Sequence, residues 1–492
     1  MNTDAWNAAL WALVAVSITA AGLAFLGSPS RQRKEEGVLG GFLLAGTRLG
    51  RSSVISLLLS GSFGLNGLFY QIWLGYTVGA WGLVTQGAWA LSFVLLSTRT
   101  SKIVQHTSIH DLLGSSFGVV TKVAAGIFSI IGMGYMLGWE VGIGQSMFSG
   151  LLTSQDGVGN GAEVGSAWLA GAVVVAALLY TILGGIRGNA IADILLNGLK
   201  IVLVFGAAMY LVFFYGDNVV EGLLPSLDKM VENLGYWGLA TNIAFSLMWQ
   251  FVDMTTWQST IAGKDNPVED TAWNLKWSGL AVFMAPGVLG TLIGAALVGT
   301  EGINAENILS TAIQIVSGSS DILLFLAFAS LIACMLSLID GLLLANAFAI
   351  VIDVLHPRKS IDELDQNPKV AERTVLAVRV SLVLIAGIAA WGVQALLGLL
   401  GGSLFDFVYV MVITQLALSG PVIVALLTSR TQSLPMWIPI LVSAIVGFGC
   451  IILGTQESEK WLIDGAGTFT IIVSCLMGFG FSRSAPAPVA EA

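Results

Sequence analysis

The chain has 492 residues, of which 55% are hydrophobic and only 10% are charged, with a net charge of −9. No soluble core needs that much apolar sequence, and an acidic chain without a basic patch is not typical of a nucleic-acid-binding protein. The composition therefore predicts an integral membrane protein in contact with lipid.

Apolar runs long enough to cross a bilayer recur along the whole chain, each bounded by charges, Gly or Pro. About 20 helical residues span the apolar layer of a bilayer, which is roughly 30 Å thick. The pattern predicts an all-α protein with about thirteen transmembrane helices, at residues 5–27, 52–77, 80–97, 119–152, 166–184, 191–215, 237–260, 274–299, 320–354, 371–393, 400–428, 435–454 and 460–481.

The first predicted helix has an acidic start, and its basic cluster follows the apolar run, so we expect a retained helix and not a signal peptide. Lys and Arg in short loops stay on the cytoplasmic side during insertion. With the N-terminus outside, only Lys229 and Lys460 of the basic loop residues fall on the outer side. We therefore expect a multi-pass protein of the cell (inner) membrane with a cytoplasmic C-terminus.

Two of the predicted helices, 119–152 and 320–354, are longer than a bilayer requires, and each is the third of five helices counted from 52 or from 237. The first helix of each set is interrupted at mid-depth, in "LLLSGSFGLNGLFYQ" and in "LMWQFVDMTTWQ". Paired interrupted helices in two inverted repeats are the best sequence indication of a midplane binding site. The predicted units are 1–37 (an N-terminal helix and basic cytoplasmic loop), 38–216 and 217–430 (the two five-helix repeats), and 431–492 (two C-terminal helices and a polar tail).

Four further stretches carry a resemblance to a known family: "FLLAGTRLGR", "YTILGGIRGNAIAD", "LIACMLSLIDGLLLANA" and "SLFDFVYVM" followed by Pro421. Together with the stretch around Asp253, they resemble the sodium/solute symporters over residues 38 to 430. The resemblance implies the leucine-transporter-like fold, a 5+5 inverted repeat, here with one extra N-terminal and two extra C-terminal helices. It also implies a cation-coupled secondary active transporter, a symporter for a small polar organic solute with alternating access about a midplane site.

The resemblance implies sodium as the coupling ion, held by the backbone carbonyls of Ser60, Phe63 and Cys334 and by two hydroxyls. The hydroxyl positions fall on Ser337 and Leu338. A Leu cannot ligate a hard cation, which takes about six oxygen ligands. The sodium site is therefore expected to be weak.

Glu140 lies deep in the long helix 119–152, where burial of a carboxyl group favours proton exchange. Proton coupling through Glu140 is accordingly an alternative to sodium coupling. A position near the outer mouth is the other interpretation of this residue.

The solute site is expected around Asp253, which matches a solute-contacting position of the family, although a helix cap is an alternative. Trp249 and Trp257 lie four residues to either side of it, which on one helix would place all three near one face. Further residues that match or neighbour solute-contacting positions, or that we add as an aromatic candidate, are Ser62, Asn66, Trp73, Gln86 and Tyr409. Aromatic walls with amides and hydroxyls suit a small polar solute, neutral or cationic.

Two other function classes remain. A transport-deficient solute sensor could use the same pocket, whereas an integral membrane enzyme would need clustered His, Cys or acidic ligands that the sequence does not place together.

The three Cys fall inside predicted helices and imply no disulfide, metal or cofactor framework. The three His fall in predicted cytoplasmic loops and indicate no site. The run "VDMTTWQ" is similar to the urea-carrying branch of the family, which favours a small amide or amine as solute.

Overall fold

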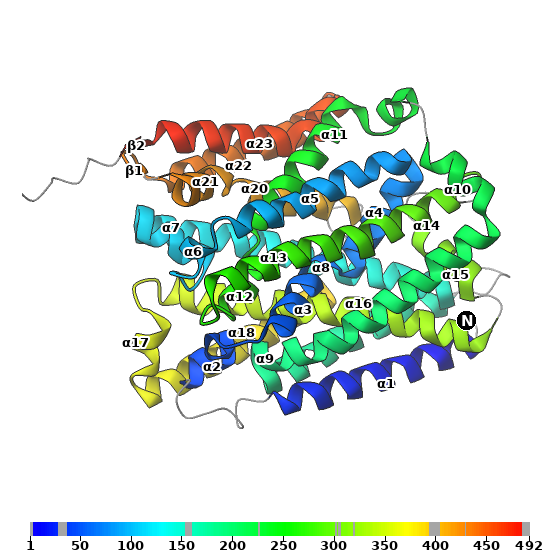
Figure 1. Cartoon of the computed structure of the whole chain (residues 1–492), viewed down its shortest axis with the longest axis horizontal. Helices are drawn as coiled ribbons and strands as arrows, with labels where there is room; N and C mark the ends of the chain where they lie inside the picture. Colours follow the sequence, from blue (N-terminus) through cyan, green and yellow to red (C-terminus); the bar gives the residue numbers. More distant parts are fainter. Residues whose placement is uncertain are drawn as a thin grey trace, which may run out of the picture.

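The structure is a computed structural model that describes residues 3–27, 37–152, 160–224, 227–300, 303, 307–317, 320–392, 404–428 and 430–484. The basic cluster at 31–34 and the polar tail beyond 484, both part of the predicted organisation, lie outside these residues. Long helices run side by side across Figure 1, with α17, α2 and α7 at one end of the bundle and α10 and α15 at the other. We name these ends the α17 end and the α10 end.

The first half of the chain forms an N-terminal helix and a set of helices broken at several points. Its elements are α1 (Thr3–Leu26), α2 (Val38–Leu44), η3 (Ala45–Thr47), α3 (Arg51–Ser62), α4 (Leu65–Val78), η4 (Gly79–Trp81), α5 (Gly82–Ser97), α6 (Thr100–Ile103), α7 (Ile109–Phe117), α8 (Val119–Leu152), α9 (Asn160–Phe214) and α10 (Gly216–Leu223).

The second half repeats the broken-helix pattern and adds two long helices at its end. Its elements are α11 (Leu227–Val252), α12 (Met254–Ile261), α13 (Val268–Val282), η5 (Phe283–Leu289), α14 (Gly290–Ala296), α15 (Ile308–Ser317), α16 (Asp321–Phe348), η6 (Ala349–Leu355), α17 (Ile361–Asp365), α18 (Pro368–Gly387), η7 (Ile388–Gly392), α20 (Leu404–Leu416), α21 (Ser419–Leu427), β1 (Arg430–Gln432), α22 (Trp437–Gln456), α23 (Lys460–Gly480) and β2 (Ser482–Ser484).

The short strands β1 and β2, which the sequence analysis did not predict, pair antiparallel with Arg430 opposite Ser484. They join the segment after α21 to the end of α23, and every other regular element in the described ranges is helical. The predicted all-α class is therefore confirmed.

Ten helices in the described residues are long and apolar enough to cross a membrane, or eleven if the bent pair Val38–Thr47 and Arg51–Ser62, at 97°, is one span. The sequence predicts separate helices at 166–184 and 191–215, but α9 continues through both and is only interrupted at Gly185, where φ is +54°. A Cβ at this glycine would lie 2.5 Å from the Phe42 carbonyl oxygen, so the close approach requires glycine. The count of thirteen, the unit boundaries and the orientation stay predictions.

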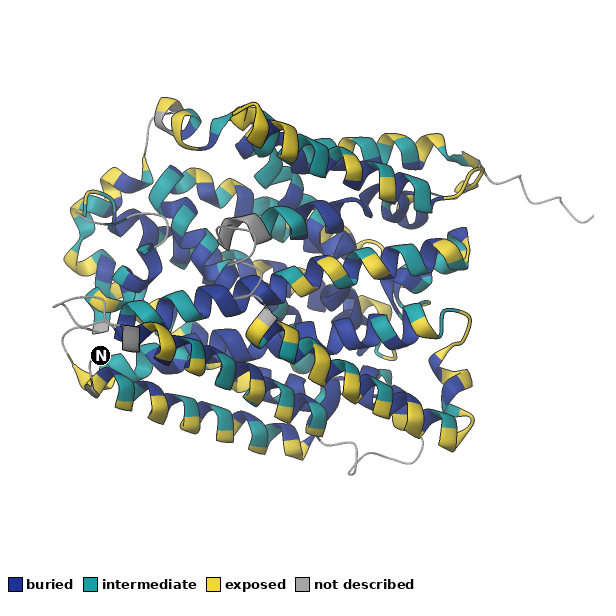
Figure 2. Ribbon diagram, turned by 180° about the vertical axis from the view of Figure 1, so that it is seen from behind, coloured by how far each residue is buried: buried dark blue, intermediate teal, exposed yellow. Residues whose placement is uncertain are grey.

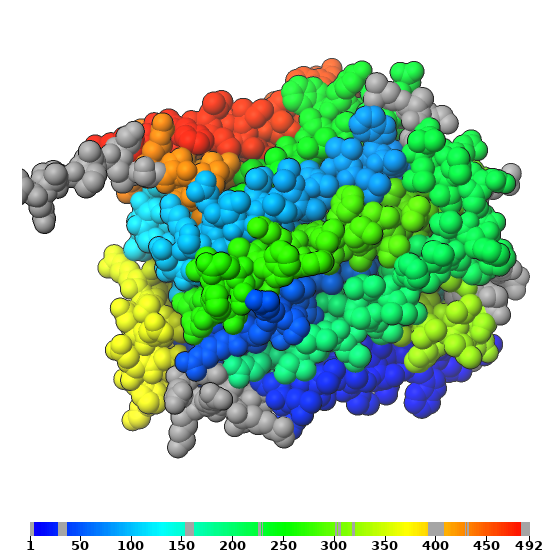
Figure 3. All heavy atoms as spheres, in the orientation of Figure 1, coloured from blue at the N-terminus to red at the C-terminus, as the bar shows by residue number. Residues whose placement is uncertain are grey.

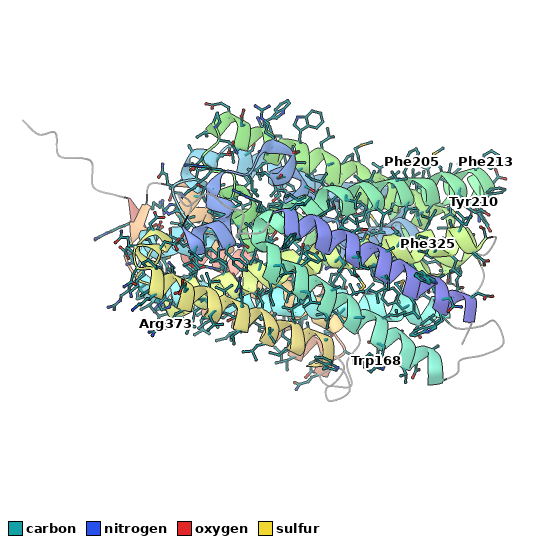
Figure 4. The ribbon with its side chains drawn as sticks, turned by 90° about the horizontal axis from the view of Figure 1, so that it is seen from below. Trp168, Phe205, Tyr210, Phe213, Phe325 and Arg373 are labelled. Carbon is teal, nitrogen blue, oxygen red and sulfur yellow. The ribbon has the colours of Figure 1, made fainter. Side chains whose placement is uncertain are left out.

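The outer surface of the bundle is apolar, as a membrane requires. Buried residues fill the interior in Figure 2, and the exposed ones follow the outer faces of the helices. Trp168 and Phe213 on α9 are 73% and 81% exposed, and Figure 4 shows them with Phe205 along the rim of the bundle. Large exposed apolar side chains on long apolar helices are stabilised by lipid, so the chain is a multi-pass membrane protein.

The interior is organised around α16, which packs against α9, α8, α3 and α18. In Figure 3, α5 from the first half and α13 from the second lie next to each other on one face, and these two helices are in contact. The two halves are therefore interleaved, and the broken helices of both lie inside the bundle.

Candidate functional site

Both interruptions that the sequence predicts are present as breaks in the helices. The first break lies at Phe63 and Gly64, between α3 and α4. The second lies at Asp253, between α11 and α12, where ψ is 110°. A Cβ at Gly64 would lie 2.2 Å from Leu338 Cδ2, so α16 packs directly into the first break. Freed backbone groups are therefore available at two points inside the bundle.

A carboxylate from α8 satisfies the backbone at the start of α4. Glu140 Oε1 accepts a hydrogen bond from the Leu65 N–H at 2.7 Å, and Oε2 accepts one from the Asn66 N–H at 2.8 Å. The first N–H groups of a helix lack partners within the helix, and the helix dipole favours a negative charge there. Glu140 is fully buried and bonds to the start of α4, which favours a role at the first break over a position near the outer mouth.

A lysine from α9 satisfies the other side of the same break. Lys200 Nζ donates to the Phe63 carbonyl oxygen at 2.8 Å and to Ser337 Oγ at 2.7 Å. The ammonium also lies 5.0 Å from the centroid of the Phe63 ring, and the side chain is fully buried. The sequence analysis did not single out Lys200. The sequence does carry a signal for this residue, because Lys200 lies inside the apolar run "ILLNGLKIVLV" and a charge within a membrane helix is rare and usually functional.

These contacts bear directly on the predicted sodium site. The Phe63 carbonyl and the Ser337 hydroxyl, both predicted ligands, accept hydrogen bonds from the lysine ammonium. The same hydroxyl donates to the Cys334 carbonyl at 3.2 Å, and Leu338 is fully buried where a second hydroxyl was expected. A sodium ion needs about six oxygens and no cation among them. This arrangement of donors and acceptors does not fit sodium.

Ser60, the remaining predicted ligand, lies beside the same cluster. Its side chain accepts a hydrogen bond from Asn197 Nδ2 at 3.0 Å, and the same amide nitrogen donates to the Ser56 carbonyl at 2.9 Å. Asn197 thus ties α9 to α3 one turn before Lys200. Two polar residues of α9 therefore hold the end of α3 in place.

The second break is satisfied locally. Asp253 Oδ1 accepts from the Thr255 N–H at 2.9 Å, and Oδ2 accepts from the Thr256 N–H at 3.1 Å. Both threonine hydroxyls also donate to this carboxylate. With every one of these bonds buried, the geometry favours the helix-cap interpretation that the sequence left open. A solute contact of Asp253 stays a prediction.

The break also separates the two tryptophans that the sequence placed on one helical face. Trp249 belongs to α11 and lines a cavity that also borders the first break. Trp257 belongs to α12 and is not among the residues that line this cavity. Trp257 Nε1 donates to the Phe251 carbonyl at 3.1 Å, so this hydrogen bond connects α12 to α11 across the break. The predicted common face is wrong, because side chains four residues apart share a face only where the helix is continuous.

A cavity of about 330 Å³ lies beside the first break, and Trp249, one turn before the second break, also lines it. Six of the eight predicted solute-contacting residues line it: Ser62, Asn66, Trp73, Gln86, Trp249 and Tyr409. Asp253 and Trp257 are the two predicted residues outside the lining. Its size is that of a site for a small organic molecule.

Aromatic side chains that were not among the predicted site residues complete the wall. The ring of Trp89 stacks on Trp249 at 5.6 Å and meets Phe245 edge-on at 5.7 Å, and Trp139 lines the same cavity. Trp139 directly precedes Glu140, so one turn of α8 supplies both a wall residue and the cap of α4. Sequence spacing alone did not separate these aromatics from the other tryptophans of the chain.

The cavity wall carries hydrogen-bond donors without protein partners. Among the described residues, buried atoms of the lining that have no hydrogen-bond partner in the protein are Asn66 Nδ2, Trp89 Nε1, Trp139 Nε1, Trp249 Nε1 and Ser62 Oγ. Four of these five atoms are N–H groups that only donate. Because buried polar atoms nearly always have a partner, we take these groups as candidate donors to a bound molecule with acceptor oxygens.

The two ends of the bundle differ in how the site meets the surface. The cavity extends towards the α10 end, where Lys460 and Asp464 of α23 belong to its lining. At the α17 end, the carboxylate of Asp365 accepts hydrogen bonds from the Leu39 and Gly40 N–H groups at 2.9 and 2.8 Å and so holds the start of α2. These contacts hold the chain segment before α3 in place on the side away from the cavity.

A buried polar network, which the sequence analysis did not foresee, joins α7 to α8 and η6. His110 Nδ1 lies 2.8 Å from Asp353 Oδ2, and its Nε2 lies 2.9 Å from Ser129 Oγ. Lys122 Nζ lies 3.4 Å from the same Asp353 carboxylate. His110 lies in α7 and is 1% exposed, so its predicted place in a loop is wrong.

No protein-family model matches the chain, and no curated protein matches it. Its structure is similar to an outward-open, substrate-bound Na⁺-coupled sialic acid symporter, with a TM-score of 0.71 and 13% identity over 98% of this chain and 100% of that one. It is also similar to MhsT in complex with L-phenylalanine, with a TM-score of 0.53 and 16% identity over 88% of this chain and 98% of that one. A third similar structure is MHP1, a nucleobase-cation-symport-1 family transporter with bromovinylhydantoin bound, with a TM-score of 0.55 and 12% identity over 91% and 94%.

At these identities the likeness establishes the fold. The chain therefore has the inverted-repeat fold of the leucine transporter, as the sequence resemblance implied, with the helix breaks and the central cavity that belong to it.

Proposed function

We propose that the chain is a secondary active transporter, driven by a cation gradient, that carries a small, polar, uncharged organic solute by alternating access about the central cavity. The observation that carries this proposal is the cavity itself, which lies beside the first helix break and is walled by aromatics, several of which have an N–H group without a protein partner. Broken helices at a repeat interface are the binding sites of secondary transporters. That the similar structures are symporters supports the same class.

The charge on the solute follows from Glu140. In transporters with broken helices, the N-terminal end of a half-helix attracts an anionic group of the solute. Here the carboxylate of Glu140 already accepts the Leu65 and Asn66 N–H groups at the start of α4. A solute carboxylate would be repelled by it and would find these donors occupied. The free donors of the wall favour neutral acceptors such as amide carbonyls and hydroxyls.

A thermal-shift screen of the purified protein tests this solute class. We expect neutral amides, ureas, cyclic imides or sugars to raise the melting temperature, and free amino acids and carboxylates to leave it unchanged. A hit should then be taken up into proteoliposomes, which separates a transporter from the sensor alternative. A hit that binds with a stoichiometry of one and is never transported would favour the sensor.

Proton coupling through Glu140 stays a prediction about the driving ion. In its support, the residue is buried beside the cavity and electrostatically linked to Lys200. Against it, two backbone N–H groups donate to the carboxylate, and such donors favour its charged form. Solute uptake driven by a proton gradient in the unmodified protein, and lost in Glu140→Gln, would establish it.

A further inference from the structure

The position predicted to hold sodium is the point where the two halves of the molecule meet. Phe63 belongs to the first break, between α3 and α4, and Ser337 belongs to α16 in the second half. Lys200 reaches both from α9, with Nζ 2.8 Å from the Phe63 carbonyl oxygen and 2.7 Å from Ser337 Oγ. One positive charge therefore bridges the two halves, and it is covalently attached to the chain.

We propose that the ammonium of Lys200 permanently takes the place of sodium at this position, so that the chain binds its solute without a sodium ion there. The inference deepens the proposed function, on which it rests, by stating how the cation position of that same site is filled. The observation behind it is that two predicted sodium ligands, the Phe63 carbonyl and the Ser337 hydroxyl, accept hydrogen bonds from Lys200.

The chemistry of the cluster favours an ammonium over a metal ion. An ammonium brings three donors and binds well to a carbonyl and a hydroxyl, whereas sodium needs a fuller shell of oxygens. Leu338 supplies a hydrocarbon face where a second hydroxyl was expected, and its side chain packs against Gly64. Asp193, Glu140 and Asp340 are buried acidic groups whose charges favour the ammonium form of Lys200. A sodium ion placed beside the ammonium would be repelled by it.

A tethered cation has a consequence for transport. A bound sodium ion can leave on the opposite side of the membrane, and its departure couples the ion gradient to the cycle. The ammonium of Lys200 cannot leave, because α9 holds it. It can bridge Phe63 and Ser337, as sodium would, and keep Ser62 and Asn66 in position at the cavity wall. A sodium gradient then gives no driving force at this position.

Equilibrium binding of ²²Na⁺ to the purified, solute-free protein in detergent tests the inference. We expect no saturable binding, and the same melting temperature in sodium chloride as in choline chloride at equal ionic strength. Saturable sodium binding by the unmodified protein that is lost in Ser337→Ala would overturn the inference. This measurement needs no solute, so its failure leaves the proposed function standing, and a failure to find any solute leaves the sodium result standing.

A double variant tests whether the ammonium is what excludes sodium. Lys200→Ala with Leu338→Ser removes the tethered charge and restores the missing hydroxyl, and we expect it to gain the saturable sodium binding that the unmodified protein lacks. Lys276→Ala is the matched control, since it removes a lysine from an exposed position of α13 and should leave sodium binding unchanged. A double variant that elutes as a folded monodisperse protein and still binds no sodium would contradict the exclusion. If it does not fold, the measurement on the unmodified protein decides.

Discussion

The two helix breaks solve the same physical problem in opposite ways. At the second break, Asp253 accepts hydrogen bonds from N–H groups two and three residues further along the chain. At the first break, the partners come from far away in the sequence, with Glu140 lying 75 residues beyond Leu65 and Lys200 lying 137 residues beyond Phe63. The second break is therefore a local cap, whereas the first is held by a charged residue from each of two other helices.

This difference assigns different roles to the two breaks. The local cap fixes the shape of α11 and α12 and leaves no charge directed at the cavity, since Asp253 is not part of the lining. At the first break the chain supplies both charged partners, Glu140 and Lys200. They occupy the positions at which transporters of this fold hold an anionic group of the solute and a cation. The predictions below test this comparison, in order of decreasing effect.

Removing the long-range carboxylate should have the largest effect on stability. Glu140→Ala leaves the Leu65 and Asn66 N–H groups unsatisfied and takes away a compensating charge of Lys200. Breaking such a buried charged arrangement costs about 3–5 kcal/mol. We expect a large fall in the melting temperature in detergent, and a smaller one for Glu140→Gln, which keeps an acceptor oxygen. Equal effects of the two variants would mean that the neutral acceptor oxygen of Gln contributes nothing once the charge is lost.

Filling the first break should be the next most damaging change. Gly64→Ala would place a Cβ 2.2 Å from Leu338 Cδ2, and overpacking of this kind costs about 1–3 kcal/mol. Leu338→Ala in the same molecule should relieve the clash, so that the double variant loses less stability than the sum of the losses in the two single variants. Simple additivity in chemical or thermal unfolding would show that Leu338 does not define the break.

Removing the local cap should reduce stability and leave the solute site intact. Asp253→Ala loses the cap of α12, which is worth about 1–2 kcal/mol, while Asp253→Ser retains a capping oxygen and should keep most of it. We expect the affinity for a solute found by the screen to change less than threefold in both. A tenfold loss of affinity in a folded Asp253→Ala protein would instead establish the solute contact that the sequence resemblance implied.

The smallest effect should come from a single donor of the cavity wall. Trp249→Phe keeps an aromatic ring and removes a buried N–H without a protein partner, so one hydrogen bond to the solute, worth about 0.5–1.5 kcal/mol, should be lost. Trp257→Phe is the matched control, because its N–H is bonded to the Phe251 carbonyl. Isothermal titration should show weaker binding for the first variant and unchanged binding for the second. The reverse result would place the solute against α12.

The sequence predicted the features that depend on local composition. Glycine and polar residues inside apolar runs predicted both breaks. The resemblance to a family of the same fold placed four residues on the cavity wall, Ser62, Asn66, Gln86 and Tyr409, and Trp73 and Trp249 were aromatic candidates. The long helices α8 and α16 were also recognisable, because their apolar runs exceed the thickness of a bilayer.

The features that the sequence did not predict depend on which helices become neighbours. Lys200 is one charge in an apolar helix until α9 packs beside the first break, and nothing in its local sequence names Phe63 and Ser337 as its partners. Trp89 and Trp139 became wall residues for the same reason. His110 lies between two predicted membrane helices, yet α7 packs it against Ser129 and Asp353.

The most direct measurement is a high-resolution cryo-electron microscopy map of the protein, recorded once in sodium chloride and once in choline chloride. The account predicts the same density in both, continuous along the Lys200 side chain and ending between the Phe63 carbonyl and the Ser337 hydroxyl. A separate, spherical density between Phe63 and Cys334 that is present only in sodium, with Lys200 turned away, would contradict the claim that this chain supplies its own cation.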